Sequence, residues 1–231
     1  MPHLLIRLAA GASALMLGLA AHAASFQAHV QEADGTPVKD AVISLKGPGG
    51  KAPGPAQAIM DQRAKAYLPH VLAVHTGTAV SFPNSDNIRH QVYSFSPAKR
   101  FELRLYEGTP TSPIVFDKPG IVVLGCNIHD WMLGYLYVTD DPWFAVTDAQ
   151  GNASISEVPV GAYQVTAWHP QSADQQLQPQ GEVRIEEAGT RHSYTLAITP
   201  LPANTPQAPA PSEFGEAFGK AVQETTREAT K

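Results

Sequence analysis

A short run of metal-ligating side chains is the strongest constraint in this sequence. Cys126, His129 and Met132 lie within seven residues of each other, directly after the apolar run Ile121–Leu124. Four apolar residues in a row predict a central strand that is packed on both faces. A thiolate, an imidazole and a thioether then follow at its end, and soft sulfur ligands select copper over the hard cations. We therefore expect the rest of the chain to frame a copper-binding loop.

A fourth candidate ligand, His90, lies upstream in a segment with strand-like alternation. Ile88, His90 and Val92 share one parity, so His90 is expected to face the apolar side of its strand. Two imidazoles, one thiolate and one weak axial thioether form the ligand set of a mononuclear blue copper centre. We predict that one copper ion, changing between Cu(I) and Cu(II), is bound by His90, Cys126, His129 and Met132.

The segment Leu124-Gly125-Cys126-x-x-His129-x-x-Met132 resembles the ligand loop of the cupredoxins, and its short spacing is most similar to amicyanin. Residues 73–84 resemble the strand, turn and strand before the first histidine ligand of that family. Two positions depart from the family pattern: Gln91 replaces the usual Asn, and Asp130-Trp131 replaces Pro-Phe. The resemblance implies a Greek-key β-sandwich and a type 1 copper that carries one electron.

A second β-sandwich is expected on either side of this region. Residues 24–47 and 143–200 resemble the two halves of a carboxypeptidase-regulatory, transthyretin-like sandwich, with strand patterns separated by turn signals at Asp34-Gly35, at residues 148–151 and at residues 158–161. We expect an all-β fold in which a cupredoxin sandwich, residues 56–140, is inserted into or followed by this second small sandwich. About seven short strands are expected within residues 56–140. Proteins of this nested arrangement resemble those labelled as methylamine-utilisation proteins.

The two ends of the chain have different compositions from the middle. Residues 1–23 contain Arg7, an apolar stretch and the small-x-small sequence Ala21-His22-Ala23, which together indicate a signal peptide. The apolar stretch is short for a membrane span, so we expect a periplasmic or otherwise exported protein without a membrane span after cleavage. Residues 201–231 indicate a Pro-rich linker and a short C-terminal helix, interpreted either as a frayed tail or as a docking helix.

Charge and cysteine content narrow the classes of function. The chain has 16 Lys and Arg against 21 Asp and Glu, a net charge of −5. Loss of residues 1–23 removes one Arg and no acid, which leaves 15 basic against 21 acidic residues and a net charge of −6. A negative net charge does not favour nucleic acid as a partner. The chain has a single cysteine and cannot form an intramolecular disulfide. A thiol in an oxidising compartment needs either burial as a core residue or a metal.

Two interpretations from different classes follow. The first is an exported one-electron carrier whose redox partner docks near His129 and Trp131. The second is a periplasmic copper-holding or assembly protein, or a non-redox binding module that uses the second sandwich. No HExxH, P-loop or Gly-x-Ser-x-Gly motif is present, so we expect an electron-transfer protein rather than an enzyme. The remaining histidines of the mature chain form no spaced cluster: His29, His70, His75, His169 and His192.

Overall fold

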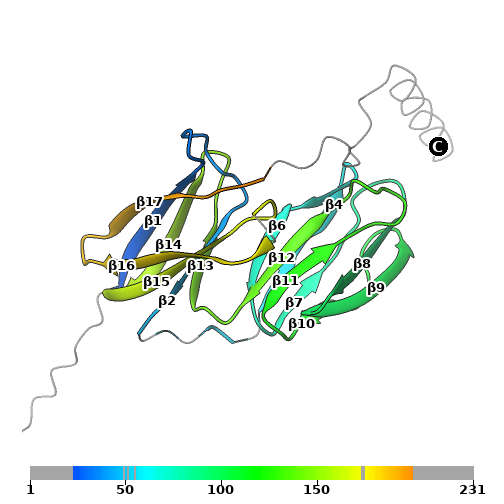
Figure 1. The fold of residues 1–231 in the computed structure, drawn as a ribbon. Coiled ribbons are helices and arrows are strands. Elements are labelled where there is room, and N and C mark those ends of the chain that lie inside the picture. Colours follow the sequence, from blue (N-terminus) through cyan, green and yellow to red (C-terminus); the bar gives the residue numbers. More distant parts are fainter. Residues whose placement is uncertain (1–22, 49, 51, 55, 173–174, 200–231) are drawn as a thin grey trace, which may run out of the picture.

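The computed structural model describes residues 23–48, 50, 52–54, 56–172 and 175–199. Within these residues the fold is all-β, as predicted, with strands β1 to β17 and no α-helix. Nothing in the described part of the chain forms a helix long and apolar enough to cross a membrane. The expected signal peptide, but for its last residue, and the expected linker and helix of residues 201–231 lie outside the described residues. Two β-sandwiches lie side by side (Figure 1).

The first sandwich joins strands from the beginning and the end of the described chain. One sheet has the order β14-β1-β17, in which β1 pairs antiparallel with β14 and parallel with β17. The other has the order β13-β2-β15-β16. Alternate residues Phe26, Ala28 and Val30 of β1 are buried in its core, as the strand period requires. The strands are β1 (Ala23–Gln31), β2 (Val42–Lys46), β13 (Trp143–Val146), β14 (Asn152–Pro159), β15 (Gly161–Trp168), β16 (Gln178–Ile185) and β17 (Thr190–Thr195).

The second sandwich is built from β3 to β12. Its sheets have the orders β10-β7-β3 and β11-β12-β6, with the two-stranded pairs β4-β5 and β8-β9. Ten strands stand where about seven were expected, because β3, β4, β5 and β10 have three residues each, too few for a visible period. The strands are β3 (Gln57–Ile59), β4 (Asp61–Arg63), β5 (Ala66–Leu68), β6 (Val71–His75), β7 (Thr78–Ser81), β8 (His90–Ser96), β9 (Lys99–Tyr106), β10 (Ile114–Phe116), β11 (Gly120–Leu124) and β12 (Gly134–Thr139).

The central strand of the sheet β11-β12-β6 is β12, not β11. All six residues of β12 are buried, whereas Ile121 and Val123 of β11 are only partly buried. The prediction that Ile121–Leu124 forms the central strand was therefore wrong. Sequence misses this because β12 contains Tyr135 and Tyr137, which interrupt its apolar run although both lie in a buried cluster.

A shared apolar cluster connects the two sandwiches. It contains Val42 and Trp168 from the first sandwich and Val71, Tyr135 and Tyr137 from the second. Trp168 is fully buried, and its ring lies 6.0 and 5.9 Å from the rings of Tyr135 and Tyr137, centroid to centroid. Removing a buried Trp side chain costs about 3–5 kcal/mol. This cluster therefore fixes the position of each sandwich on the other.

Candidate metal centre

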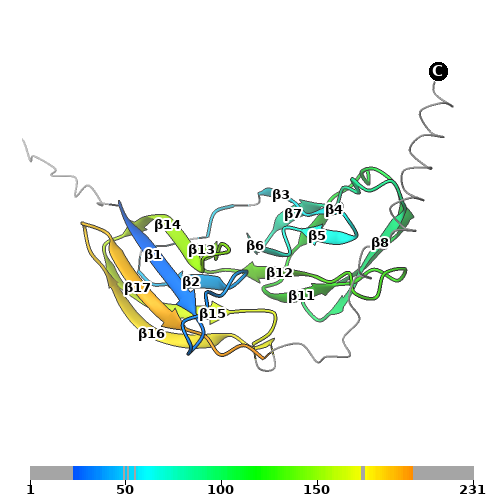
Figure 2. The same cartoon turned by 90° about the horizontal axis from the view of Figure 1, so that it is seen from above.

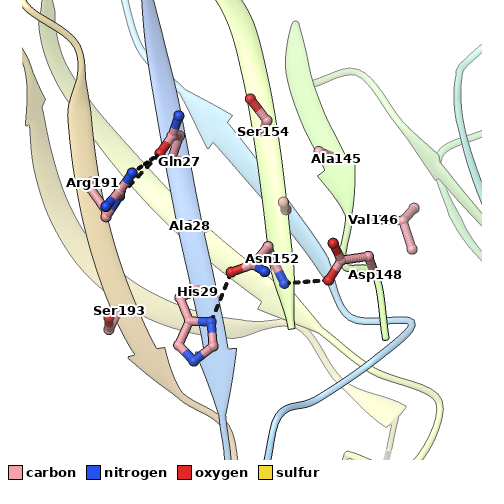
Figure 3. Close-up of a pocket in the computed structure, with 11 residues that line it drawn as sticks. Gln27, Ala28, His29, Ala145, Val146, Asp148, Asn152, Ser154, Arg191 and Ser193 are labelled. Atoms are coloured by element: carbon pink, nitrogen blue, oxygen red, sulfur yellow. Dashed lines mark hydrogen bonds between the residues drawn. The ribbon is translucent and has the colours of Figure 1, made fainter. Parts of the chain in front are cut away.

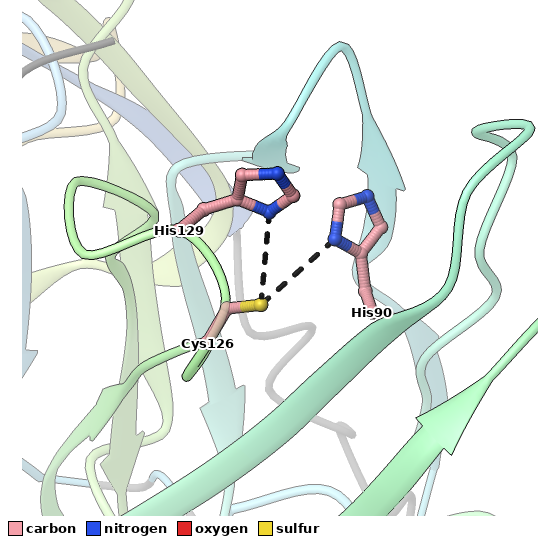
Figure 4. A group of neighbouring side chains, drawn as sticks. All are labelled: His90, Cys126 and His129. Carbon is pink, nitrogen blue, oxygen red and sulfur yellow. Dashed lines mark hydrogen bonds between the residues drawn. The ribbon is translucent and has the colours of Figure 1, made fainter.

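Three predicted ligands converge at one end of the second sandwich (Figure 4). His90 is the first residue of β8, Cys126 lies two residues beyond β11, and His129 lies in the loop between β11 and β12. The Nδ1 atoms of His90 and His129 each lie 3.9 Å from the Cys126 Sγ atom. All three ligand atoms lie within 4.8 Å of one another. Metal bonds to nitrogen and thiolate of roughly 2.0–2.3 Å can span such separations.

Burial of these side chains fits a site closed to solvent on one side. His90 is 0% exposed, which confirms the prediction that it faces the interior, and Cys126 is 3% exposed. His129 is partly exposed. Met132 is 1% exposed and packs in the same apolar cluster as Cys126. Its backbone N–H donates to the His129 carbonyl at 2.9 Å, which closes the loop that carries both residues.

Asp86 fixes the orientation of His90, and sequence analysis did not identify it. Its Oδ2 atom lies 2.8 Å from His90 Nε2, and the carboxylate also accepts the backbone N–H groups of Ala64 and Lys65 at 2.7 and 2.9 Å. Burial raises the pKa of Asp86, but the bonds from Lys65, His90 and Ala64 outweigh it and hold the pKa below its ordinary value. The carboxylate can therefore only accept, so His90 Nε2 donates to it, and Nδ1 is the ring nitrogen that faces Cys126 and can bind a metal when the ring is neutral.

A second unpredicted residue, Tyr67, holds the two ligand segments together. Its hydroxyl donates to the Gly125 carbonyl at 2.9 Å, beside Cys126, and lies 3.4 Å from the Gln91 carbonyl, beside His90. Burial and the nearby Cys126 raise the pKa of Tyr67, so the hydroxyl stays protonated. Tyr93 and Gly125 also exchange two backbone hydrogen bonds, of 3.1 and 3.0 Å. The side chain of Gln91 points elsewhere and donates to Glu102 at 2.7 Å.

The loop around His129 forms the outer edge of the site. The rings of His129 and Trp131 lie 5.1 Å apart, centroid to centroid, and Trp131 is partly buried. Ile128 is 48% exposed on the same loop. Burial, followed by the charges of His90 and Lys65, lowers the pKa of His129 below its ordinary value. The His129 ring is therefore neutral near pH 7, the form in which imidazole binds a metal.

A different hollow of about 750 Å³ lies on the first sandwich (Figure 3). Its polar side chains bond to each other: Arg191 donates to the Gln27 side-chain oxygen at 3.0 and 2.6 Å, and His29 Nδ1 lies 3.0 Å from the Asn152 oxygen. In the described residues, the group His90, Cys126 and His129 is the one cluster suited to a metal. We therefore place the candidate site in the second sandwich.

Comparisons with known proteins give partial likenesses. No protein-family profile and no curated protein matches the sequence. A purple cupredoxin from Nitrosopumilus maritimus is 24% identical over 36% of this chain and 99% of its own, with a TM-score of 0.32. A reduced amicyanin variant is 17% identical over 42% of this chain and 98% of its own (TM-score 0.32). A copper-containing nitrite reductase from Thermus scotoductus is 26% identical over 41% of this chain but only 25% of its own (TM-score 0.35). Scores of this size do not assign a function, so the geometry of the site must do so.

Proposed function

We propose that this protein is a mononuclear type 1 copper protein that carries one electron at a time. His90, Cys126 and His129 would be the three strong ligands, and Met132 the weak axial one. The supporting observation is the convergence of two imidazole Nδ1 atoms on one buried thiol, each 3.9 Å away. Two histidines, one thiolate and a distant thioether are the donor set that copper uses for electron transfer.

When bound, copper would supply the reversible one-electron change. The protein's own contribution is to keep the donor atoms in place in both oxidation states, because any rearrangement would add to the barrier. Asp86 holds the His90 ring through Nε2, while Tyr67 and the Tyr93–Gly125 backbone pair hold the two ligand segments together. The partly exposed edge of His129, beside Trp131, would let an electron pass to a docked partner.

We also infer the division of the chain. Residues 24–47 and 143–200 would form one domain and residues 56–140 the copper domain, supported by the pairing of β1 with β14 and β17. Residues 1–23 would direct export to the periplasm, where a single cysteine is protected by burial and by the metal.

Adding copper to purified apoprotein tests this function. A carrier should bind one copper per chain, show an intense thiolate-to-copper absorption in the visible range, and give a reversible voltammetric wave. Cys126→Ser should abolish the band, whereas Met132→Leu should keep it and raise the reduction potential, because a weak axial ligand tunes the potential. Tight copper binding without the band or the wave would instead indicate a copper-holding protein.

A further inference from the structure

The outer face of the β8-β9 hairpin carries an aromatic and cationic patch, which we define as Tyr93, Phe95, Arg100 and Arg104. Phe95 is 75% exposed, and its ring lies 5.3 Å from the ring of Tyr93, centroid to centroid. Arg100 is the direct cross-strand neighbour of Phe95 and shares its face, and the strand period places Arg104 on that face as well. The hairpin lies at the end of the molecule opposite the first sandwich in both views (Figures 1 and 2). The patch is therefore open to a partner.

The two arginines of this patch have no charged partner of their own. Neither Arg100 nor Arg104 forms an ion pair with any residue that the structure describes. The other basic residues of this hairpin region are paired: Arg89 with Glu107 at 3.1 Å and Lys99 with Asp117 at 2.8 Å. Glu102 lies on the same face, opposite Tyr93, and accepts a hydrogen bond from the neutral amide of Gln91, so two arginines against one carboxylate leave this face with a net charge of +1. An excess of positive charge on a chain of net charge −5 favours an acidic partner here.

The patch also lies directly against the residue before Cys126. A Cβ atom on Gly125 would lie 2.6 Å from both Cζ and Oη of Tyr93, so the phenol ring rests on the glycine backbone. Tyr93 and Gly125 also exchange two backbone hydrogen bonds. A shallow hollow of about 330 Å³ lies between Tyr93, Phe95, Val123 and Leu133 and has room for an apolar side chain. A short covalent and hydrogen-bonded route thus connects the thiol to exposed Phe95.

We propose that this patch is a second docking surface, for an acidic electron-transfer protein with a carboxylate-lined face, separate from the His129 loop. The inference rests on the proposed copper function. One electron would pass between Cys126 and the partner through Gly125 and Tyr93, which leaves the copper one unit more oxidised and the partner's redox centre one unit more reduced, with no bond made or broken. A second copy of this chain is disfavoured as the occupant, because two such patches would repel each other.

An anionic paramagnetic probe locates the surface without copper. Hexacyanochromate(III), titrated into the isotope-labelled apoprotein, should broaden the amide signals of β8 and β9 near Phe95, Arg100 and Arg104. The double variant Arg100→Gln/Arg104→Gln should lose this broadening. The matched control Lys46→Gln/Arg184→Gln removes two exposed charges from the first sandwich and should keep it. Broadening centred elsewhere, or unchanged in the double variant, would overturn the proposed surface and leave the copper assignment intact.

Electron exchange with an anionic oxidant tests whether the surface is used. The copper-loaded, reduced protein is mixed with hexacyanoferrate(III) at low ionic strength. The Arg100→Gln/Arg104→Gln variant should react about 3- to 10-fold more slowly than wild type, because it loses part of the electrostatic attraction that speeds association. The control pair should change the rate less than the hairpin pair. Phe95→Ser should also slow the oxidation of the reduced protein by an acidic redox protein of higher reduction potential. Equal rates in the hairpin and control variants would contradict the proposal.

Discussion

Replacing Asp86 tests whether the structure holds His90 in place before any metal binds. Asp86→Ala removes the acceptor 2.8 Å from His90 Nε2 and leaves that N–H without a partner in a side chain that is 0% exposed. The Ala64 and Lys65 N–H groups also lose their acceptor, but both residues are exposed and water can replace it. The buried bond therefore dominates, and a hydrogen bond to a charged group is worth about 1.5–3 kcal/mol.

We expect Asp86→Ala to lower the free energy of unfolding of the apoprotein by about 2–3 kcal/mol, measured by urea denaturation. Copper affinity, measured by competition with a chelator, should fall by about 10- to 100-fold, the usual effect of losing such a partner of a metal-bound histidine. Asp86→Asn should be intermediate, because its amide oxygen can still accept from His90 but has fewer acceptor sites.

Asp117→Ala is the matched control, since it also removes a carboxylate that is paired with one cation, Lys99, at 2.8 Å. The Asp117 side chain is 59% exposed, so this substitution should leave both stability and copper affinity nearly unchanged. If Asp86→Ala proved no more disruptive than Asp117→Ala, Asp86 would not be what orients His90.

Three further outcomes follow from the packing and from burial. Gly125→Ala should lower the free energy of unfolding by about 1–3 kcal/mol, because the Tyr93 ring has to move. In a double-mutant cycle, Tyr93→Ala should remove part of that cost, and additive effects would contradict the close approach of the two residues. Trp168→Ala should cost about 3–5 kcal/mol, and wild type should show a single calorimetric transition for both sandwiches. Burial is the main cause that lowers the pKa of His169 in the folded protein below 6.5. As the pH drops below 6.5, the unfolded chain therefore binds a proton at His169 before the folded protein does, and the free energy of unfolding should fall. Urea midpoints at pH 7.5 and 5.5 should therefore differ less in His169→Gln, and an unchanged difference would refute this source.

Local sequence patterns predicted the features that depend on neighbouring residues. The alternation around His90 predicts its inward face, and the short spacing of Cys126 and His129 brings their side chains to one loop. The all-β class follows from many short strands and turn signals. In each case the deciding interaction lies within a few residues along the chain.

Features that depend on distant contacts could not be predicted. Tyr67 reaches Gly125 across 58 positions, and nothing around it in the sequence marks it as part of the site. Asp86 left a weak signal, a carboxylate four residues before His90, which is informative only once the loop conformation is known. The two-sided burial of β12 likewise depends on the packing of Tyr135 and Tyr137 against Trp168 of the other sandwich.

Copper K-edge X-ray absorption on the copper-loaded protein tests the central claim most directly. One short thiolate sulfur and two imidazole nitrogens should surround the metal, with the Met132 thioether as a weak and more distant ligand; the short sulfur signal should disappear in Cys126→Ser, and one imidazole should be lost in His90→Ala. A coordination shell of oxygen and nitrogen alone, or one unchanged in these variants, would show that the buried thiol and the two histidines do not form the metal site.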